Sequence, residues 1–357
     1  KNPEENNWDT IIPQNNNTLT SVNVINDKLV AHYMVDVLSK WIIHDLKGEI
    51  IQEVELPGPG ISYGFGGSKE QSVSWYTFES LVHPPTVFMY DFDTFKSNSY
   101  YDSKAKFDKD RFIMKQDFYF SKDGTKIPIF IAHEKDLVLD GSAPTLLYGY
   151  GGFNISEKPY FNKSIPVILE NGGVYAIACI RGGGEYGQDW HSQGMLEKKQ
   201  NVFDDFIAAS EFLIFQGFTS SDRLAIRGGS NGGTLIGAVI NQKPELFRVA
   251  FPEVGVMDML RYEKFTIGWA WAVEFGSVEN KNSFMNLLSY SPLHNIKKKS
   301  YPSVLIYTAD HDDRVVPAHS YKYAAKLQKN QMNDIDPILI RIGTKTGHGA
   351  GKSIEIK

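Results

Sequence analysis

The chain has 357 residues, a length that predicts two domains rather than one. Its hydrophobic content of 42% and charged content of 22% are typical of soluble globular proteins, and no apolar run is long enough to cross a bilayer. A formal net charge of −5 provides no basic field for a nucleic acid or an anionic membrane, so neither is expected as a partner. The single cysteine, Cys179, lies in an apolar run, which rules out an intrachain disulfide and favours a buried thiol in a reducing compartment.

Residues 21 to 100 have the pattern of an all-β region, with short strand-like runs separated by turn signals. The run WIIHDL at 41–46 has a counterpart in VFMYDF at 87–92, and HYMV at 32–35 has one in WYTF at 75–78. Repeats of roughly 40–50 residues are typical of propeller blades, and a generic β-meander is the alternative. Because about two blades cannot close a ring of roughly 4–8, we expect further blades upstream.

After about residue 105 the pattern changes to strands that alternate with helices. Runs at 111–120 and 126–133 flank Asp123-Gly124, which is a strong hairpin signal. Further apolar strand runs are expected at 143–150, 173–180, 223–227, 248–254, 303–309 and 337–343. The clearest helix is predicted at 201–216, with Asn201 as its N-cap, Asp204 and Asp205 in its first turn and Gly217 after its end. This alternation indicates a doubly wound, mostly parallel sheet that is covered on both faces.

The segment GGSNGG at 228–233 lies between the strand run at 223–227 and an apolar helical run that begins at Thr234. A G-x-S-x-G sequence between a strand and a helix is the nucleophile-elbow pattern. Glycines are needed there because side chains beside the serine would collide in so tight a turn. The alternative is a glycine-rich surface turn whose serine has no catalytic role. The nucleophile elbow is favoured only if the chain also supplies an acid, a base and an oxyanion donor.

An acid and a base follow Ser230 in the order that an α/β-hydrolase requires. Asp310, Asp312 and Asp313 come directly after the strand run at 303–309, and the residues alone do not choose among them. His348 lies between two glycines near the C-terminus, so its loop can approach the elbow. His311-Asp312-Asp313 could also indicate a metal site, but adjacent ligands give poor geometry, so we expect no metal.

Two other glycine-rich segments need interpretation. GGGEYG at 182–187 has the form G-x-G-x-x-G, but 188–191 is expected to continue as a loop, so we reject a dinucleotide site and expect no cofactor. YGYGGF at 148–153 ends a strand where this fold places its second oxyanion donor. Either a backbone N–H or the Tyr150 hydroxyl could serve, and a core tyrosine is the alternative.

Five ordered motifs resemble the prolyl oligopeptidase family: YGYGGFNIS (148–156), RGGGEYG (181–187), GGSNGG (228–233), TADHDDRVVP (308–317) and GHGAGK (347–352). The resemblance covers residues 105 to 352, and residues 21 to 100 resemble the last blades of that family's seven-bladed propeller. It implies part of an all-β propeller domain in 1–104 and an α/β-hydrolase peptidase domain in 105–357. The family's closing C-terminal helix is not found, so we expect this sequence to be a portion of a longer enzyme.

The resemblance implies a cytoplasmic serine endopeptidase that cleaves short peptides after proline through an acyl-enzyme, as a monomer when full-length and without a cofactor. It assigns Ser230 as nucleophile, Asp312 as acid and His348 as base. The oxyanion donors would be the Tyr150 hydroxyl and the backbone N–H of Asn231. The residues implied for substrate binding are Phe153, Val256, Trp271, Phe275, Arg314 and Val315.

Within this set, Trp271 would stack on the proline ring and Arg314 would hold the P2 carbonyl. Phe275 departs from the family, which usually has a tyrosine there. Three alternatives remain: a related peptidase that cleaves after basic residues, an esterase on the same fold, and a non-catalytic binding module that uses the β-region. Basic specificity would require carboxylates in the pocket, and the residues assigned to it offer none.

Overall fold

The computed structural model describes residues 8–349, which divide into two compact units. The first unit contains residues up to 114 together with 158–166, and the second contains 115–157 and the chain from 167 onward.

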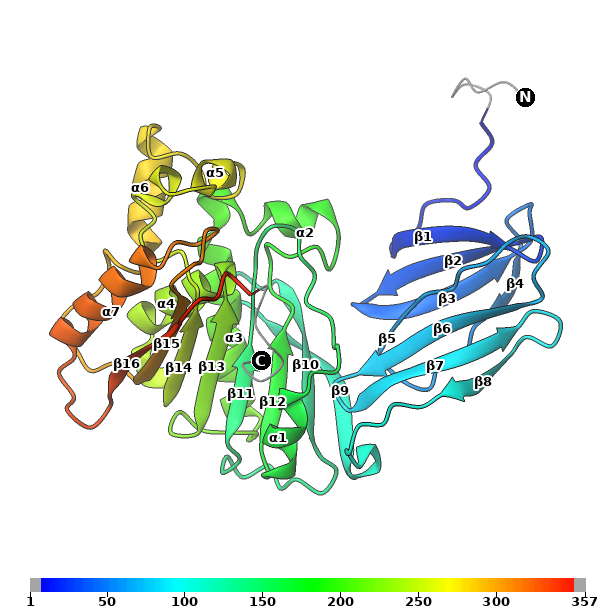
Figure 1. The fold of residues 1–357 in the computed structure, drawn as a ribbon, viewed down its shortest axis with the longest axis horizontal. Coiled ribbons are helices and arrows are strands. Elements are labelled where there is room, and N and C mark those ends of the chain that lie inside the picture. Colours follow the sequence, from blue (N-terminus) through cyan, green and yellow to red (C-terminus); the bar gives the residue numbers. More distant parts are fainter. Residues whose placement is uncertain (1–7, 350–357) are drawn as a thin grey trace. The chain divides into compact units, whose positions relative to one another are not determined.

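The first unit contains two four-stranded antiparallel sheets (Figure 1). The strands of the first sheet are β1 (Thr18–Ile25), β2 (Lys28–Val35), β3 (Leu38–His44) and β4 (Ile50–Glu53). Those of the second sheet are β5 (Ile61–Tyr63), β6 (Val73–Ser80), β7 (His83–Asp91) and β8 (Lys96–Tyr101). The matching sequence runs occupy β2 and β6, and β3 and β7, which are the second and third strands of each sheet. The two-copy blade repeat is therefore confirmed.

Phe65 lies at the centre of the aromatic core of this unit. Its ring is 4.7 Å from that of Trp41 on β3 and 4.9 Å from that of Tyr76 on β6. The indole N–H of Trp41 donates to Ser62 Oγ at 3.1 Å, which leaves no buried donor unpaired on that ring. Because Trp41 and Tyr76 come from different sheets, this aromatic cluster joins the two repeats into one core.

The second unit is built on a sheet that, among the described residues, has eight strands in the order β16-β15-β14-β13-β11-β12-β10-β9 (Figure 1). The pairs from β12 through β11 to β16 are parallel, and β10 pairs with β12 antiparallel. Its strands are β9 (Phe112–Phe120), β10 (Lys126–Glu134), β11 (Thr145–Tyr148), β12 (Val174–Ala178), β13 (Leu224–Gly229), β14 (Val249–Glu253), β15 (Ser303–Ala309) and β16 (Ile338–Gly343). Helix α1 (Ser164–Glu170) begins in the first unit and continues into the second. The other helices are α2 (Gln188–Ser192), α3 (Gln200–Phe215), α4 (Asn231–Gln242), α5 (Ala272–Phe275), α6 (Lys281–Tyr290) and α7 (Ala318–Asn330).

This strand order is that of an α/β-hydrolase sheet, and it places a switch point at β11. β11 lies between β12 and β13 and runs parallel to both, with Leu147 beside Ile226 and Tyr148 beside Arg227. The chain leaves β11 and β13 at the same edge of the sheet, and in open α/β sheets ligands bind in the crevice at that point. Helix α4 follows β13, is buried from Asn231 to Ile240 and contacts β13 and β14. The start of α4 is therefore fixed by the core.

The start of α3 differs from the prediction. The helix begins at Gln200, and the Asn201 amide donates to the Gln193 carbonyl instead of capping the helix. The cause is a 3-10 turn at Leu196–Lys198, which leads into α3 with Lys199 already in helical conformation. Asp204 and Asp205 consequently lie beyond the first turn. Gly217 ends the helix with a φ of +77°, as expected.

The segment at 188–191 also differs from the prediction, because it forms the short helix α2 rather than a loop. The glycine loop before it is nevertheless filled by protein. A Cβ on Gly183 would be 2.1 Å from the carboxylate of Glu185, which is 2% exposed. A buried carboxyl group thus fills the loop where a pyrophosphate would have to approach, which is consistent with our rejection of a dinucleotide site there.

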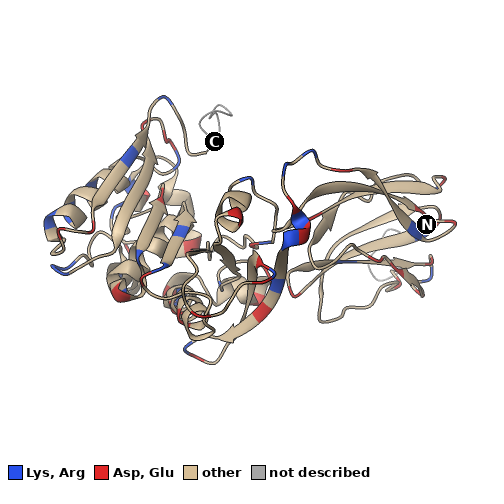
Figure 2. Cartoon of the chain, turned by 90° about the horizontal axis from the view of Figure 1, so that it is seen from below, with Lys and Arg blue, Asp and Glu red and all other residues tan. Residues whose placement is uncertain are grey.

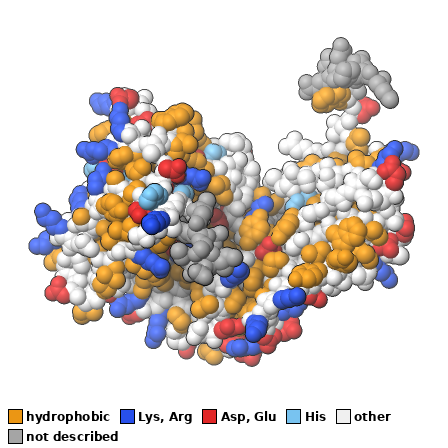
Figure 3. All heavy atoms as spheres, in the orientation of Figure 1, with side chains coloured by type: hydrophobic (Ala, Val, Ile, Leu, Met, Phe, Trp, Pro, Cys, Tyr) orange, Lys and Arg blue, Asp and Glu red, His pale blue; other side chains and the backbone are white. Residues whose placement is uncertain are grey.

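The surface has an ordinary mixed composition. Figure 2 shows basic residues interspersed with acidic residues in each unit, which agrees with the modest formal net charge of −5. Hydrophobic side chains also reach the surface in both units (Figure 3), as they do in most folded proteins. Among residues 8–349, none of the helices combines the length and hydropathy needed to span a membrane.

Candidate active site

Ser230 lies in a strained turn between β13 and α4. Its φ is +57° and its ψ is −116°, a conformation that a non-glycine residue adopts only when its surroundings impose it. The Ser230 N–H donates to the Glu253 carbonyl on β14 at 2.8 Å, which fixes the turn to the sheet. A Cβ on Gly228 would lie 2.4 Å from the Gly232 carbonyl oxygen, so the spacing of the glycines is sterically required. The elbow predicted from the sequence is thus present in the backbone.

Asp312 and His348 form a hydrogen-bonded pair. His348 Nδ1 lies 2.7 Å from Asp312 Oδ2, and Asp312 is only 3% exposed. The other carboxylate oxygen accepts the backbone N–H groups of Arg314 at 3.1 Å and Val315 at 2.8 Å. Because a carboxylate can only accept, His348 donates through Nδ1 and presents Nε2 as its acceptor nitrogen.

The neighbouring acids that the sequence left open have other surroundings. Asp310 lies 2.7 Å from the exposed ring of His311, and Asp313 is exposed. The structure therefore brings Asp312, and neither neighbour, to His348. Within residues 8–349, no group of three His, Cys, Asp or Glu side chains has the arrangement of a metal site.

Tyr150 and Asn231 lie beside Ser230. Burial, with the nearby Glu157 and Glu274 carboxyls, raises the pKa of Tyr150 to about 12, and a hydrogen bond to Ser230 opposes that rise. The Tyr150 hydroxyl is therefore protonated at neutral pH and can donate. The backbone N–H of Asn231 is at the first position of α4, where the helix dipole favours negative charge. Asn231 Nδ2 also donates to the Tyr150 carbonyl at 2.6 Å, which links the two candidate oxyanion donors.

A cavity of about 340 Å³ opens beside Ser230. Its lining residues are Tyr150, Phe153, Ile155, Ser230, Asn231, Val256, Ile267, Trp271 and Arg314. Trp271 lies parallel to the buried ring of Tyr262, with ring centres 6.4 Å apart. Tyr262 in turn donates its hydroxyl to the Gly276 carbonyl at 2.7 Å, so the indole has a fixed support.

Two residues assigned to this pocket do not line the cavity. Phe275 is fully buried and meets the ring of Phe153 edge-on at 5.5 Å, and Val315 is 2% exposed. Phe275 therefore supports the wall from behind, and Val315 is buried in the core of the unit. Ile155 and Ile267 line the cavity although the sequence analysis did not identify them. They lie in loops without periodic patterning, so the sequence offered no signal for them.

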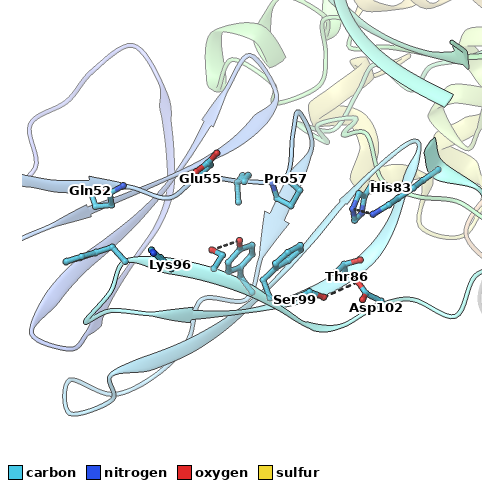
Figure 4. Close-up of a pocket in the computed structure, with 14 residues that line it drawn as sticks. Gln52, Glu55, Pro57, His83, Thr86, Lys96, Ser99 and Asp102 are labelled. Atoms are coloured by element: carbon cyan, nitrogen blue, oxygen red, sulfur yellow. Dashed lines mark hydrogen bonds between the residues drawn. The ribbon is translucent and has the colours of Figure 1, made fainter. Parts of the chain in front are cut away.

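A larger cavity of about 610 Å³ lies in the first unit, among residues from β6, β7, β8 and the segment after β4 (Figure 4). Its polar groups are largely paired with each other. Lys109 Nζ lies 3.1 Å from His83 Nε2, and Ser99 Oγ donates to Asp102 at 3.1 Å. This cavity shows no nucleophile comparable to Ser230.

A mostly parallel sheet of this order, with a serine at a strained strand–helix turn and a carboxylate–histidine pair downstream, defines the α/β-hydrolase class. Within that class, the chain belongs to the prolyl oligopeptidase family. The model of the prolyl oligopeptidase family matches residues 159–356, and the model of its N-terminal beta-propeller domain matches residues 1–103.

Individual relatives agree with this assignment. The chain is 48% identical over 357 residues to a prolyl endopeptidase of Elizabethkingia miricola, covering 99% of this chain and 50% of that protein. It is 42% identical over 352 residues to a prolyl endopeptidase of Dictyostelium discoideum, covering 96% and 46%. The chain thus spans about half the length of the relatives it matches.

Solved structures give the same result. One from a study of two prolyl endopeptidases superposes with a TM-score of 0.92 at 42% identity, covering 97% of this chain and 51% of that chain. Prolyl oligopeptidase B from Galerina marginata gives a TM-score of 0.90 at 37% identity, covering 96% and 49%.

Proposed function

We propose that the complete protein is a serine endopeptidase that hydrolyses short peptides on the carboxyl side of proline. One observation carries the proposal: Ser230 lies in a strained elbow beside the Tyr150 hydroxyl, in a unit where Asp312 holds His348 in the tautomer of a general base. Relatives that share 48% and 42% of the sequence are named prolyl endopeptidases, which supports the same activity here.

The proposed reaction uses each of these groups in turn. Ser230 Oγ attacks the scissile carbonyl while His348 Nε2 takes its proton, and Asp312 stabilises the imidazolium that forms. The Tyr150 hydroxyl and the Asn231 N–H bind the oxyanion of the tetrahedral intermediate. His348 then protonates the leaving amine, and water hydrolyses the acyl-enzyme by the same steps. Among residues 8–349, no hydrogen bond joins Ser230 to His348, so we expect that contact to form when substrate binds.

Selectivity for proline is proposed from the shape and chemistry of the cavity beside Ser230. Phe153, Val256 and Trp271 give it flat aromatic and aliphatic walls suited to a pyrrolidine ring. No carboxylate is among its lining residues, so it offers no partner for a basic side chain. Arg314 lines the same cavity and is exposed, which allows it to donate to the P2 carbonyl of a substrate.

The finer features belong to the same proposal. We propose that residues 1–104 are the last blades of a propeller domain and that 105–357 belong to the peptidase domain. The enzyme would act as a monomer in the cytoplasm. The fully buried thiol of Cys179 suits a reducing compartment, and size-exclusion chromatography of the complete protein tests the monomer.

The test is labelling and turnover in the complete protein. A fluorophosphonate probe should modify the native protein, and a short chromogenic proline peptide should be cleaved. Ser230→Ala should abolish both, with a loss in kcat that approaches roughly 10⁶-fold. Ser289→Ala is the control and should retain activity, because this serine is on α6 and its hydroxyl donates to the Asn286 carbonyl of the same helix. Cleavage of esters without cleavage of proline peptides would favour the esterase alternative, and absence of labelling would favour a binding module.

A further inference from the structure

A buried charged cluster lies behind the proposed site and has no role in the reaction described above. Lys199, at the start of α3, is 1% exposed, and Glu274, on α5, is 2% exposed. Lys199 Nζ lies 3.4 Å from Glu274 Oε1, and His191 Nε2 on α2 lies 2.7 Å from Glu274 Oε2. Burying two opposite charges is costly unless each is paired and hydrogen-bonded, so a buried lysine calls for an explanation.

The third contact of this cluster reaches the loop that follows β11. Lys199 Nζ donates to the carbonyl of Gly151 at 2.9 Å. Gly151 directly follows Tyr150, whose own carbonyl accepts from Asn231 Nδ2 at 2.6 Å. Two successive carbonyls are therefore held by side chains from elsewhere in the chain, the first from α4 and the second from the start of α3.

This loop needs such anchors because its backbone is strained. Gly151 has a φ of +65°, and the non-glycine residues Phe153 and Asn154 have φ values of +56° and +57°. Two consecutive non-glycine residues in the left-handed region persist only when their surroundings determine them. The strained segment carries both the candidate oxyanion hydroxyl of Tyr150 and one wall of the cavity, Phe153.

The ammonium group also contacts the other side of this wall. Lys199 Nζ lies 5.3 Å from the ring centre of Phe275, which directly follows Glu274. Phe275 meets Phe153 edge-on at 5.5 Å. The ammonium group thus contacts both the Gly151 carbonyl, two residues before Phe153, and the ring of Phe275, which packs against Phe153. Burial lowers the pKa of Lys199, and the carboxylate of Glu274 opposes that change.

From these contacts we infer that Lys199 is a positioning residue of the active site. Its ammonium group, paired with Glu274, holds the Gly151 carbonyl and so fixes the Tyr150 hydroxyl at the place where the oxyanion develops. This inference rests on the proposed function. A donor displaced by about 1 Å can cost on the order of 100-fold in rate, so the position of Tyr150 should limit kcat rather than KM.

The test is a double-mutant cycle in the complete protein. Lys199→Met should lower kcat on a proline peptide by roughly 10–100-fold and change KM by less than about threefold. In a Tyr150→Phe background the same substitution should cost less than about threefold, because the hydroxyl that Lys199 positions is already absent. Equal losses of kcat in the two backgrounds would overturn the inference. A native protein without activity on proline peptides would instead overturn the proposed function.

Two further variants separate positioning from folding. Lys199→Met leaves the buried Glu274 carboxyl with His191 but without its lysine, so Lys199→Met with Glu274→Met removes both members of the lysine–glutamate pair and should restore part of the lost thermal stability. The double variant should still have the lowered kcat of Lys199→Met, because the Gly151 carbonyl still lacks its ammonium partner. Recovery of full kcat would contradict the inference. The control is Arg248→Met with Asp336→Asn, an ion pair between a residue just before β14 and a residue just before β16. A comparable fall in kcat in that control would show that lost stability, and not position, is the cause.

Discussion

Asp312 and His348 are 36 residues apart in the sequence, yet Asp312 Oδ2 lies 2.7 Å from His348 Nδ1. The second oxygen of Asp312 is held by the N–H groups of Arg314 and Val315, so the carboxylate cannot rotate without losing hydrogen bonds. The pair therefore fixes the imidazole in orientation and in tautomer together. Asp310 has a different partner: its carboxylate lies 2.7 Å from the ring of His311.

Asp312→Asn should lower kcat by roughly 10⁴-fold on a proline peptide, because an amide N–H facing Nδ1 would favour the wrong tautomer of His348. Asp310→Asn is the matched control and should change kcat by no more than a few-fold. Steady-state kinetics of both variants at one pH provide the measurement. A greater loss from Asp310→Asn than from Asp312→Asn would show that the acid is misassigned.

Local patterns in the sequence were sufficient to predict those parts of the fold that a tight turn or a repeat determines. The elbow at Ser230 could be predicted because collisions such as the one at Gly228 leave glycine as the only residue that fits. The two sheets of the first unit could be predicted because a run of similar pattern recurs on β3 and β7. Both signals can be recognised in the sequence without knowledge of the tertiary contacts.

Other features depend on contacts between distant residues and could not be predicted. Asn201 has the side chain of an N-cap, but the preceding 3-10 turn starts α3 earlier and leaves the amide to bond Gln193. Lys199 and Glu274 are 75 residues apart, and neither has a local pattern that requires burial. The choice of Asp312 among three neighbouring acids likewise came from a family resemblance, since the residues alone left it open.

Trp271→Ala should lower kcat/KM for proline substrates by roughly 10–30-fold more than for alanine substrates. Stacking on the proline ring and burial of its apolar surface each contribute about 1 kcal/mol or more, and alanine offers neither contact. The measurement is the ratio of kcat/KM for two peptides that differ only at P1. Trp269→Ala, an exposed tryptophan two residues away, is the control. Equal losses on both peptides would assign Trp271 a structural role.

Arg314→Ala should lower kcat/KM by a similar factor whatever residue the substrate has at P1, because the contact proposed for the Arg314 side chain is with a backbone carbonyl of the substrate. We expect roughly a tenfold fall in kcat/KM, the effect of about one charge-assisted hydrogen bond. The backbone N–H of Arg314 that binds Asp312 is retained in this variant, so the triad acid stays in place. The same pair of peptides provides the measurement, and a loss confined to the proline peptide would contradict the assignment.

Glu157 should make stability depend on pH. Burial raises the pKa of its carboxyl to about 7 in the folded protein, from an ordinary value of 4.5. Above pH 7 the folded protein must therefore hold a partly desolvated charge, which lowers the free energy of unfolding. As pH falls from about 7 towards 4.5, the folded state takes up a proton before the unfolded state does, and this penalty disappears.

Glu157→Gln should accordingly raise the Tm of the complete protein at pH 8 and leave it nearly unchanged near pH 4.5. The side chain is partly exposed, so solvent screens the effect, and we expect on the order of 1 kcal/mol, or about 2–4 °C. Thermal unfolding at a series of pH values provides the measurement. Glu211→Gln, an exposed glutamate on α3, is the matched control and should show a small difference that is the same at every pH. A Tm difference for Glu157→Gln that grows as the pH falls would contradict the assigned direction of the pKa change.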